Sequence, residues 1–186
     1  MEVRLEMSVY RYIQSDFYRI YGKCNFSTIL KGFILNDTLR FQCFFRLSKS
    51  SVWGRIGRIL MKIDGTRQRI QISPYMSVGY GLYIGHGGPI VCNSTTILGN
   101  NVNLSQFVTI GANEGAVAHI GDNVYIGPNV CIVENISIGN NVTIGAGSVV
   151  VKSIPNDATV AGNYAKILNF NNPGRFINRR WDIKRI

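Results

Sequence analysis

Residues 120–150 decide the fold, and they read IGDNVY IGPNVC IVENIS IGNNVT IGAGSVV. Each unit begins with isoleucine, and the same six-residue series continues upstream with only Thr96 and Glu114 interrupting it. Its members are Ile72, Val78, Ile84, Ile90, Val102, Val108, Ile120, Ile126, Ile132, Ile138, Ile144 and Val150. A period of six fits neither a helical turn of about 3.6 residues nor the alternation of a strand. It predicts a solenoid, a parallel β-helix built from hexapeptides.

Glycine and asparagine recur where the predicted coils turn, because both tolerate left-handed backbone conformations. The corner triplets are Gly99-Asn100-Asn101, Gly121-Asp122-Asn123 and Gly139-Asn140-Asn141. With three hexapeptides per coil, the stretch from Arg69 to about Ile154 supports roughly four to five coils. Burying the carboxylate of Glu114 unpaired costs several kcal/mol, so we expect Gly111–His119 to leave the coil as a loop.

The segment before the repeats has helical rather than six-residue spacing. Apolar residues between positions 8 and 65 predict amphipathic helices, with Asn36 or Asp37 capping the second. A third helix is expected from about Trp53 to Ile63, before Gly65-Thr66 breaks the pattern. We therefore expect an N-terminal helical region over residues 1–68 and a β-helix domain over 69–168.

The segment after the repeats, residues 169–186, is basic. Aromatic side chains are interleaved with arginine and lysine from Arg175 to Arg185. We interpret this segment as a solvated C-terminal tail, with a specific binding element as the alternative.

Charge and cysteine content indicate the cellular compartment and the kind of partner. A formal net charge of +10 in 186 residues predicts an anionic partner or surface. Four cysteines without C-x-x-C spacing indicate a reducing compartment. The first residues contain no signal-peptide core, and the longest apolar stretches are broken by Lys31 and Arg46. We expect a cytoplasmic protein, with contact to an anionic membrane at the inner face of the plasma membrane as one use of its charge.

His86 is the strongest candidate for chemistry. It lies in Ile84-Gly85-His86-Gly87-Gly88, at a corner where glycine is the default and where a side chain faces outward. An imidazole that is neutral near pH 7 can take a proton from a hydroxyl group as that group attacks a thioester. The only other histidine, His119, ends the predicted loop, and its role is left open.

Other functions of a solenoid fit the sequence poorly. A zinc-dependent carbonic anhydrase needs three histidine ligands, and the chain has two histidines, so we expect no metal. The threonines form no flat repeated face of the kind that binds ice. The basic residues lie mostly outside the repeats and form no recognised nucleic-acid-binding motif.

Several motifs together resemble a known family. They are Ile72-Ser73-Pro74, Val78-Gly79-Tyr80-Gly81, Gly85-His86, Gln106–Gly111, Ile120–Gly127, Ile144–Val150 and Val160–Ile167. Residues 69–168 are similar to the serine O-acetyltransferase group of hexapeptide-repeat acetyltransferases, which includes relatives acting on sugars of bacterial capsules and exopolysaccharides. The resemblance implies a left-handed β-helix and a homotrimer, with acetyl-CoA bound in the groove between neighbouring chains.

The resemblance also assigns roles to residues. His86 falls on the family's catalytic base, and Gln71 stands where an acidic residue usually orients that base. A glutamine cannot stabilise imidazolium by charge, so we expect a weaker base. The cofactor contacts of the family map onto Ala112, Gly127, Pro128, Ala146 and, near the phosphates of CoA, Lys166.

Departures from the family pattern bear on the acceptor. The carboxylate usually found before the base is Gly85 here, and the loop before His119 lacks the arginine that binds the carboxylate of serine. Asp16 is a candidate for a remaining carboxylate on the acceptor side. Because a zwitterion needs both charges matched, we expect Asp16, Gly85 and His119 to line a site for a neutral sugar.

The sequence therefore predicts an acetyl-CoA-dependent O-acetyltransferase for a sugar hydroxyl in bacterial surface polysaccharide biosynthesis. A serine O-acetyltransferase of cysteine biosynthesis is the alternative enzyme. A non-catalytic solenoid scaffold is the alternative without activity.

Overall fold

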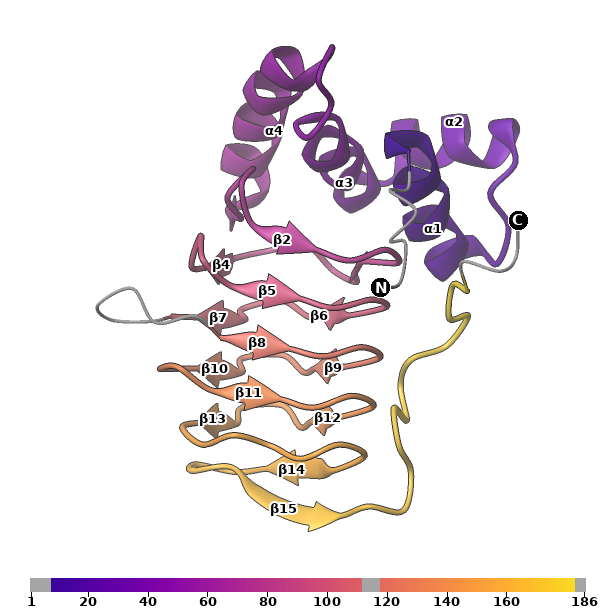
Figure 1. Cartoon of the computed structure of the whole chain (residues 1–186). Helices are drawn as coiled ribbons and strands as arrows, with labels where there is room; N and C mark the ends of the chain where they lie inside the picture. Colours follow the sequence, from indigo (N-terminus) through magenta and orange to yellow (C-terminus); the bar gives the residue numbers. More distant parts are fainter. Residues whose placement is uncertain (1–7, 112–117, 183–186) are drawn as a thin grey trace, which may run out of the picture.

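The computed structural model describes residues 8–111 and 118–182. It shows four helices set on one end of a column of short strands, with the C-terminal segment running back along the column towards the helices (Figure 1). Among the described residues, no helix has both the length and the apolar character that crossing a membrane requires.

The column is a parallel β-helix of hexapeptide repeats, as the period predicts. Its strands form three sheets, ordered β1-β4-β7-β10-β13, β2-β5-β8-β11 and β3-β6-β9-β12-β14-β15. All pairings are parallel except that of β14 with β15, which is antiparallel. The strands are β1 Ile70–Gln71, β2 Ser77–Val78, β3 Tyr83–Ile84, β4 Ile90–Cys92, β5 Ile97–Leu98, β6 Asn103–Leu104, β7 Thr109–Ile110, β8 His119–Ile120, β9 Tyr125–Ile126, β10 Cys131–Ile132, β11 Ser137–Ile138, β12 Thr143–Ile144, β13 Val149–Val150, β14 Thr159–Ala161 and β15 Lys166–Asn169.

Stacked aliphatic side chains fill the interior of the column. Each repeat turns two of them inward, two residues apart, as Val124 and Ile126 do. Thr96 takes one of these inward places and is buried, as expected for a tolerable substitute. The Asn101, Asn123 and Asn141 corners adopt the predicted left-handed conformation, with φ between 54° and 58°.

The six-residue register slips twice, which the regular aliphatic series conceals. Ile126 pairs with Ile144, eighteen residues later, but Ile84 pairs with Leu104, twenty residues later. The additional two residues lie between β3 and β4, at the corner that carries His86. Ile90 is buried despite the slip because an even insertion keeps the same face of the strand inward.

The second slip falls at the predicted loop. Leu98 pairs with Ile120, twenty-two residues later, so this coil is also longer than its neighbours. Glu114 and the rest of residues 112–117 lie outside the described residues. Gly111 and His119, however, donate backbone hydrogen bonds to Ile132 and Ile136 at 2.9 and 3.0 Å. The ends of the expected loop therefore belong to the coil.

The helical cap contains α1 (Val9–Tyr21), α2 (Phe26–Leu35), α3 (Asp37–Leu47) and α4 (Gly54–Gln68). Asn36 caps α3 by accepting a hydrogen bond from the Leu39 amide at 3.0 Å, as predicted. The predicted end of α4 near Gly65 is wrong. The helix continues to Gln68, and Gly65 lies inside it. Glycine fits this position because a Cβ atom would lie 2.9 Å from the Ile70 carbonyl oxygen.

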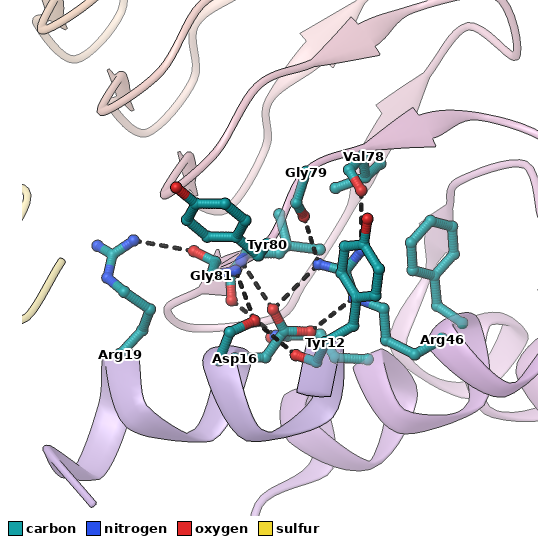
Figure 2. A network of polar contacts seen from close by, with 12 residues as sticks. Tyr12, Asp16, Arg19, Arg46, Val78, Gly79, Tyr80 and Gly81 are labelled. Atoms are coloured by element: carbon teal, nitrogen blue, oxygen red, sulfur yellow. Dashed lines mark hydrogen bonds and ion pairs between the residues drawn. The ribbon is translucent and has the colours of Figure 1, made fainter. Parts of the chain in front are cut away.

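A buried ion pair joins the cap to the first coil (Figure 2). Arg46 of α3 donates to both carboxylate oxygens of Asp16 in α1, at 2.9 and 3.0 Å. Asp16 also accepts from the Leu82 amide at 2.8 Å, and Arg46 donates to the carbonyl oxygens of Val78 and Gly79. Both side chains are at most 3% exposed. Two helices are thus hydrogen-bonded, through one pair of charges, to the backbone of the solenoid.

We expect Asp16→Asn to lower the free energy of unfolding by about 3–5 kcal/mol, because it leaves the guanidinium of Arg46 buried without a counterion. Urea denaturation followed by circular dichroism measures this. Asp37→Asn is the matched control, since Asp37 pairs with Arg40 while its side chain is 67% exposed; a loss of at most about 1 kcal/mol is expected there. Equal losses in the two variants would contradict a special role for the buried pair.

Candidate active site

A cavity of 590 Å³ opens beside the corner that carries His86. It lies between α1, the first three coils and the segment 170–182, which we call the C-terminal strap. The lining residues are Arg19, Ile20, Tyr83, Gly85, His86, Asn103, Ser105, Tyr125, Phe176, Asn178 and Arg179. Polar side chains dominate this wall, so the cavity suits a small polar substrate.

His86 is exposed on the lengthened corner. The two glycines after it, Gly87 and Gly88, have φ values of 62° and 76°, a region that residues with side chains rarely adopt. These glycines let the backbone turn sharply. The corner can therefore hold two more residues than a regular corner. The insertion and the glycines together explain how an imidazole can stand clear of the coil and face the cavity.

Four corner residues form a line down the column. The pairing of β3, β6, β9 and β12 places His86, Gln106, Pro128 and Ala146 at the same position of successive coils. Neighbouring coils are about 4.8 Å apart, so Ala146 lies about 14 Å below His86. The structure therefore brings the predicted base and two of the predicted cofactor contacts onto one edge.

Gly127, beside Pro128, has a structural reason for being glycine. A Cβ atom there would lie 2.8 Å from the Ile144 carbonyl oxygen and 2.9 Å from the Ala146 nitrogen of the next coil. Close stacking of coils therefore requires glycine at position 127, whatever lies in the groove outside.

Lys166 lies at the far end of the same edge. It begins β15 and pairs with Ala161, one residue before the corner position of the last coil. Its side chain is exposed. An anionic group that lies along the edge, at the end remote from His86, could form an ion pair with this ammonium group.

Gln106 is a site residue that the sequence reasoning quoted within a motif but did not single out. It occupies the corner directly below His86, and its Cβ lies 3.5 Å from the place of a Cβ on Gly88. Its Oε1 atom is buried and has no hydrogen-bond partner among the described residues. The signal that could have found it is the coil register, which places its side chain below His86.

Gln71 and His86 are not brought together within one chain. Gln71 ends β1 and lines a separate groove beside α4, together with Arg58, Met61 and Pro89. No hydrogen bond joins Gln71 to His86 in the described part of the chain. The prediction that Gln71 orients the base therefore finds no support in this geometry.

Two other predicted acceptor residues lie away from the cavity. Asp16 is 1% exposed, and its carboxylate is held between Arg46 and the Leu82 amide, at the contact between the cap and the first coil. His119 is exposed in β8, whose sheet is not the sheet of β3 that leads into His86. Gly85 does line the cavity, whereas Ala112 lies outside the described residues.

Arg19 gives the cavity a positive wall. It is 4% exposed and donates to Gly81 O at 2.9 Å, Asn103 Oδ1 at 2.6 Å and Asn178 O at 3.0 Å. Burial lowers the pKa of Arg19 to about 10, while the charge of Asp16 opposes this shift. Arg19 therefore remains charged at neutral pH, and all of these hydrogen-bond partners are uncharged.

The C-terminal segment is not a solvated tail, and that interpretation is corrected. Ile177 and Trp181 are buried. The Trp181 amide donates to Asn101 Oδ1 at 2.9 Å, and the rings of Phe176 and Tyr125 lie 4.8 Å apart. Phe176 therefore packs against Tyr125 of β9, and Trp181 packs at the Asn101 corner. The strap thereby becomes one wall of the cavity.

Known proteins share both the repeats and the fold. The family model for bacterial transferase hexapeptide (six repeats) matches residues 118–152. The serine acetyltransferase of Staphylococcus xylosus is 35% identical over 131 residues, which are 68% of this chain and 60% of that protein. Serine acetyltransferase 4 of Arabidopsis thaliana is 37% identical over 105 residues, 54% of this chain and 30% of that protein.

Solved structures agree. Neisseria gonorrhoeae serine acetyltransferase in complex with serine has a TM-score of 0.69 and 32% identity, over 85% of this chain and 68% of that one. The Brucella abortus enzyme in complex with coenzyme A has a TM-score of 0.67 and 26% identity, over 87% and 66%. The chain belongs to the hexapeptide-repeat acetyltransferases. It spans 60% or less of the length of these two curated relatives.

This membership corrects the expected acceptor. The sugar hydroxyl of surface polysaccharides was inferred from the missing arginine of the loop and from Gly85. The relatives named above are serine acetyltransferases, and one structure holds serine. The comparisons therefore overturn the sugar assignment and favour the serine alternative. Among the described residues, no cluster of three histidine, cysteine, aspartate or glutamate side chains could hold a metal ion.

Proposed function

We propose that this protein is a serine O-acetyltransferase, which transfers an acetyl group from acetyl-CoA to the hydroxyl group of L-serine. The observation that carries the proposal is the single corner line on which His86, Pro128 and Ala146 lie. His86 lies at one end of an edge that can hold an extended thioester substrate, and this supports its assignment as the base. Polar groups of the cavity beside His86 can hold a small hydroxyl acceptor.

His86 acts as the general base in this proposal. Its imidazole accepts the proton of the serine hydroxyl as the oxygen attacks the thioester carbonyl carbon. The tetrahedral intermediate collapses to O-acetylserine, and the carbon–sulfur bond breaks. His86 then returns the proton to the departing thiolate, which leaves as CoA. Backbone N–H groups along the corner are the donors available to stabilise the oxyanion.

The corner line also explains where acetyl-CoA would lie. Between Ala146 and His86 the corner line carries Pro128 and Gln106. Ala146 and Pro128 are compact, so an extended pantetheine arm can approach the coils closely there. Lys166, at the far end, would meet the phosphates. The missing N–H of Pro128 removes one donor at that point, so its role is one of shape.

The homotrimer stays a prediction, and one observation supports it. His119 lies in β8, whose sheet contains neither β3 nor β4, the strands on either side of His86. In a trimer, His119 of a neighbouring copy could lie beside His86 of this one. The role of His119 stays a prediction with it.

Contact with an anionic membrane is a further proposal, supported by α4. Its outward face carries Ile56, Ile59 and Ile63, and Trp53 lies just before the helix; each of the four is between 52% and 61% exposed. The opposite face is buried against α3 at Gly57, where a Cβ would lie 2.5 Å from the Ser48 nitrogen. Arg55, Arg58 and Lys62 flank the apolar stripe. Like charges disfavour pairing two such stripes, whereas anionic lipid headgroups complement them.

We expect His86→Ala to lower turnover with L-serine by about 10²–10⁴-fold, because general base catalysis is lost. Release of the CoA thiol measures it. The exposed side chain makes no contact that the fold needs, so the thermal midpoint should not change. Lys152→Ala, exposed at a different corner, should keep full turnover. A His86→Ala enzyme as active as the wild type would disprove the proposed role.

Ala146→Phe should weaken acetyl-CoA binding about tenfold or more, because the ring fills the edge along which the pantetheine arm would lie. Titration calorimetry with CoA measures the dissociation constant. Ala146 is exposed, so the core is left intact. Ser94→Phe places the same ring at an exposed position of another corner and should bind CoA normally. If both variants bound CoA with equal affinity, the corner line would not be part of the CoA-binding site.

Ile56→Glu with Ile59→Glu should abolish sedimentation with phosphatidylglycerol vesicles, and the wild type should sediment with these but not with phosphatidylcholine vesicles. Acetyl transfer should be unchanged. Arg67→Gln, at the end of α4, is the charge control and should still sediment. The membrane proposal fails if the wild type does not sediment with anionic vesicles. It also fails if the glutamate variant changes the oligomeric state instead.

A further inference from the structure

We propose that Arg179 of the C-terminal strap binds the carboxylate of the acceptor. The inference rests on the proposed function and assigns part of the same site. Arg179 lines the cavity that contains His86. The resemblance places an arginine for this role in the loop before His119, whereas Arg179 lies in the C-terminal strap.

Contacts at both sides hold Arg179 in place. Asn178, before it, accepts a hydrogen bond from Arg19 Nε through its carbonyl oxygen at 3.0 Å. Trp181, after it, exchanges backbone hydrogen bonds with the side chain of Asn101 at 2.9 and 3.1 Å. The Arg179 backbone has a φ of 50°, so the chain turns there and directs the side chain towards α1. The strap presents this guanidinium from a packed segment.

The side chain of Arg179 is anchored but keeps donors for a ligand. Its Nη1 donates to the carbonyl oxygen of Ile20 at the end of α1. Its Nε packs beside Gly22, 3.4 Å from the place of a Cβ atom on that glycine. No ion pair joins Arg179 to a carboxylate in residues 8–111 and 118–182. A guanidinium that is exposed and lacks a counterion can pair with a carboxylate through charge-assisted hydrogen bonds.

The surrounding charges favour an anion at this place. Arg19, the second cation of the wall, gives three of its five N–H groups to Gly81, Asn103 and Asn178. Its side chain is buried, so its main contribution to the cavity is its positive charge. None of the described residues that line the cavity is an aspartate or a glutamate. This positive field strengthens the binding of an acceptor that carries a carboxylate and weakens the binding of a cation.

The same asymmetry predicts how the acceptor is recognised. The α-ammonium group of serine meets no carboxylate on the described wall, because Gly85 stands beside His86. We therefore infer that the carboxylate carries the recognition and the ammonium group adds little. Glycerate, in which a hydroxyl replaces the amine, should bind comparably to serine. Serinamide, which lacks the carboxylate, should bind poorly.

Binding is measured by titration calorimetry of the full-length protein with L-serine, glycerate and serinamide. Arg179→Gln should weaken the binding of L-serine and glycerate about 10- to 100-fold, the range for lost hydrogen bonds to a charged group. It should leave serinamide unchanged. Arg179→Lys should fall between the wild type and Arg179→Gln because it keeps the charge without the paired donors. The KM for L-serine should rise in parallel, while the KM for acetyl-CoA should not.

Arg175→Gln is the matched control. Arg175 lies on the same strap, carries the same charge and stacks over Phe176 at 5.0 Å without lining the cavity. It should bind all three ligands as the wild type does. If Arg179→Gln and Arg175→Gln behave alike, or if serinamide weakens as much as serine, Arg179 is not the carboxylate site. A wild type that binds serine and glycerate through Arg179 but transfers no acetyl group would overturn the proposed function alone.

Discussion

The pairing of Asp16 with Arg46 holds the helical cap to the solenoid. Desolvating two charges costs free energy that their mutual attraction returns only when further hydrogen bonds complete the pair. Here the Leu82 amide and the carbonyl oxygens of Val78 and Gly79 provide those bonds. Arg19 lies three residues after Asp16 on the same helix, so it faces the same coil. The pair thereby places a cation on the wall of the cavity.

The position of the base follows from a departure in coil length. In a corner of regular length, the backbone of residue 86 would lie close to the coil. Its position would then be equivalent to those of Pro128 and Ala146. Two additional residues and two glycines in left-handed conformations lengthen that corner. The hydrophobic register survives because an insertion of two keeps inward residues inward. The chain can therefore change one corner while its core stays continuous.

The acceptor site shows how a function can be misread from missing residues. The loop before His119 lacks arginine and Gly85 replaces a carboxylate, and these two absences suggested a neutral sugar. The comparisons with serine acetyltransferases contradict that reading, and the structure shows cations reaching the cavity from α1 and from the strap. Neither Arg19 nor Arg179 is near His86 in the sequence. Charge complementarity is a property of the assembled wall, so an alignment of one loop cannot decide it.

The sequence by itself determined the β-helix, its asparagine corners and the candidate base, because each depends on local spacing or on local backbone conformation. It also placed Gly127, Pro128 and Ala146 in motifs that resemble a cofactor site. The tertiary structure decided that these residues share one edge with His86, that Asp16 is a buried structural group, and that the basic tail is a packed strap. These outcomes depend on contacts between segments as far apart as Arg19 and Asn178, and such contacts leave no periodic signal in the chain.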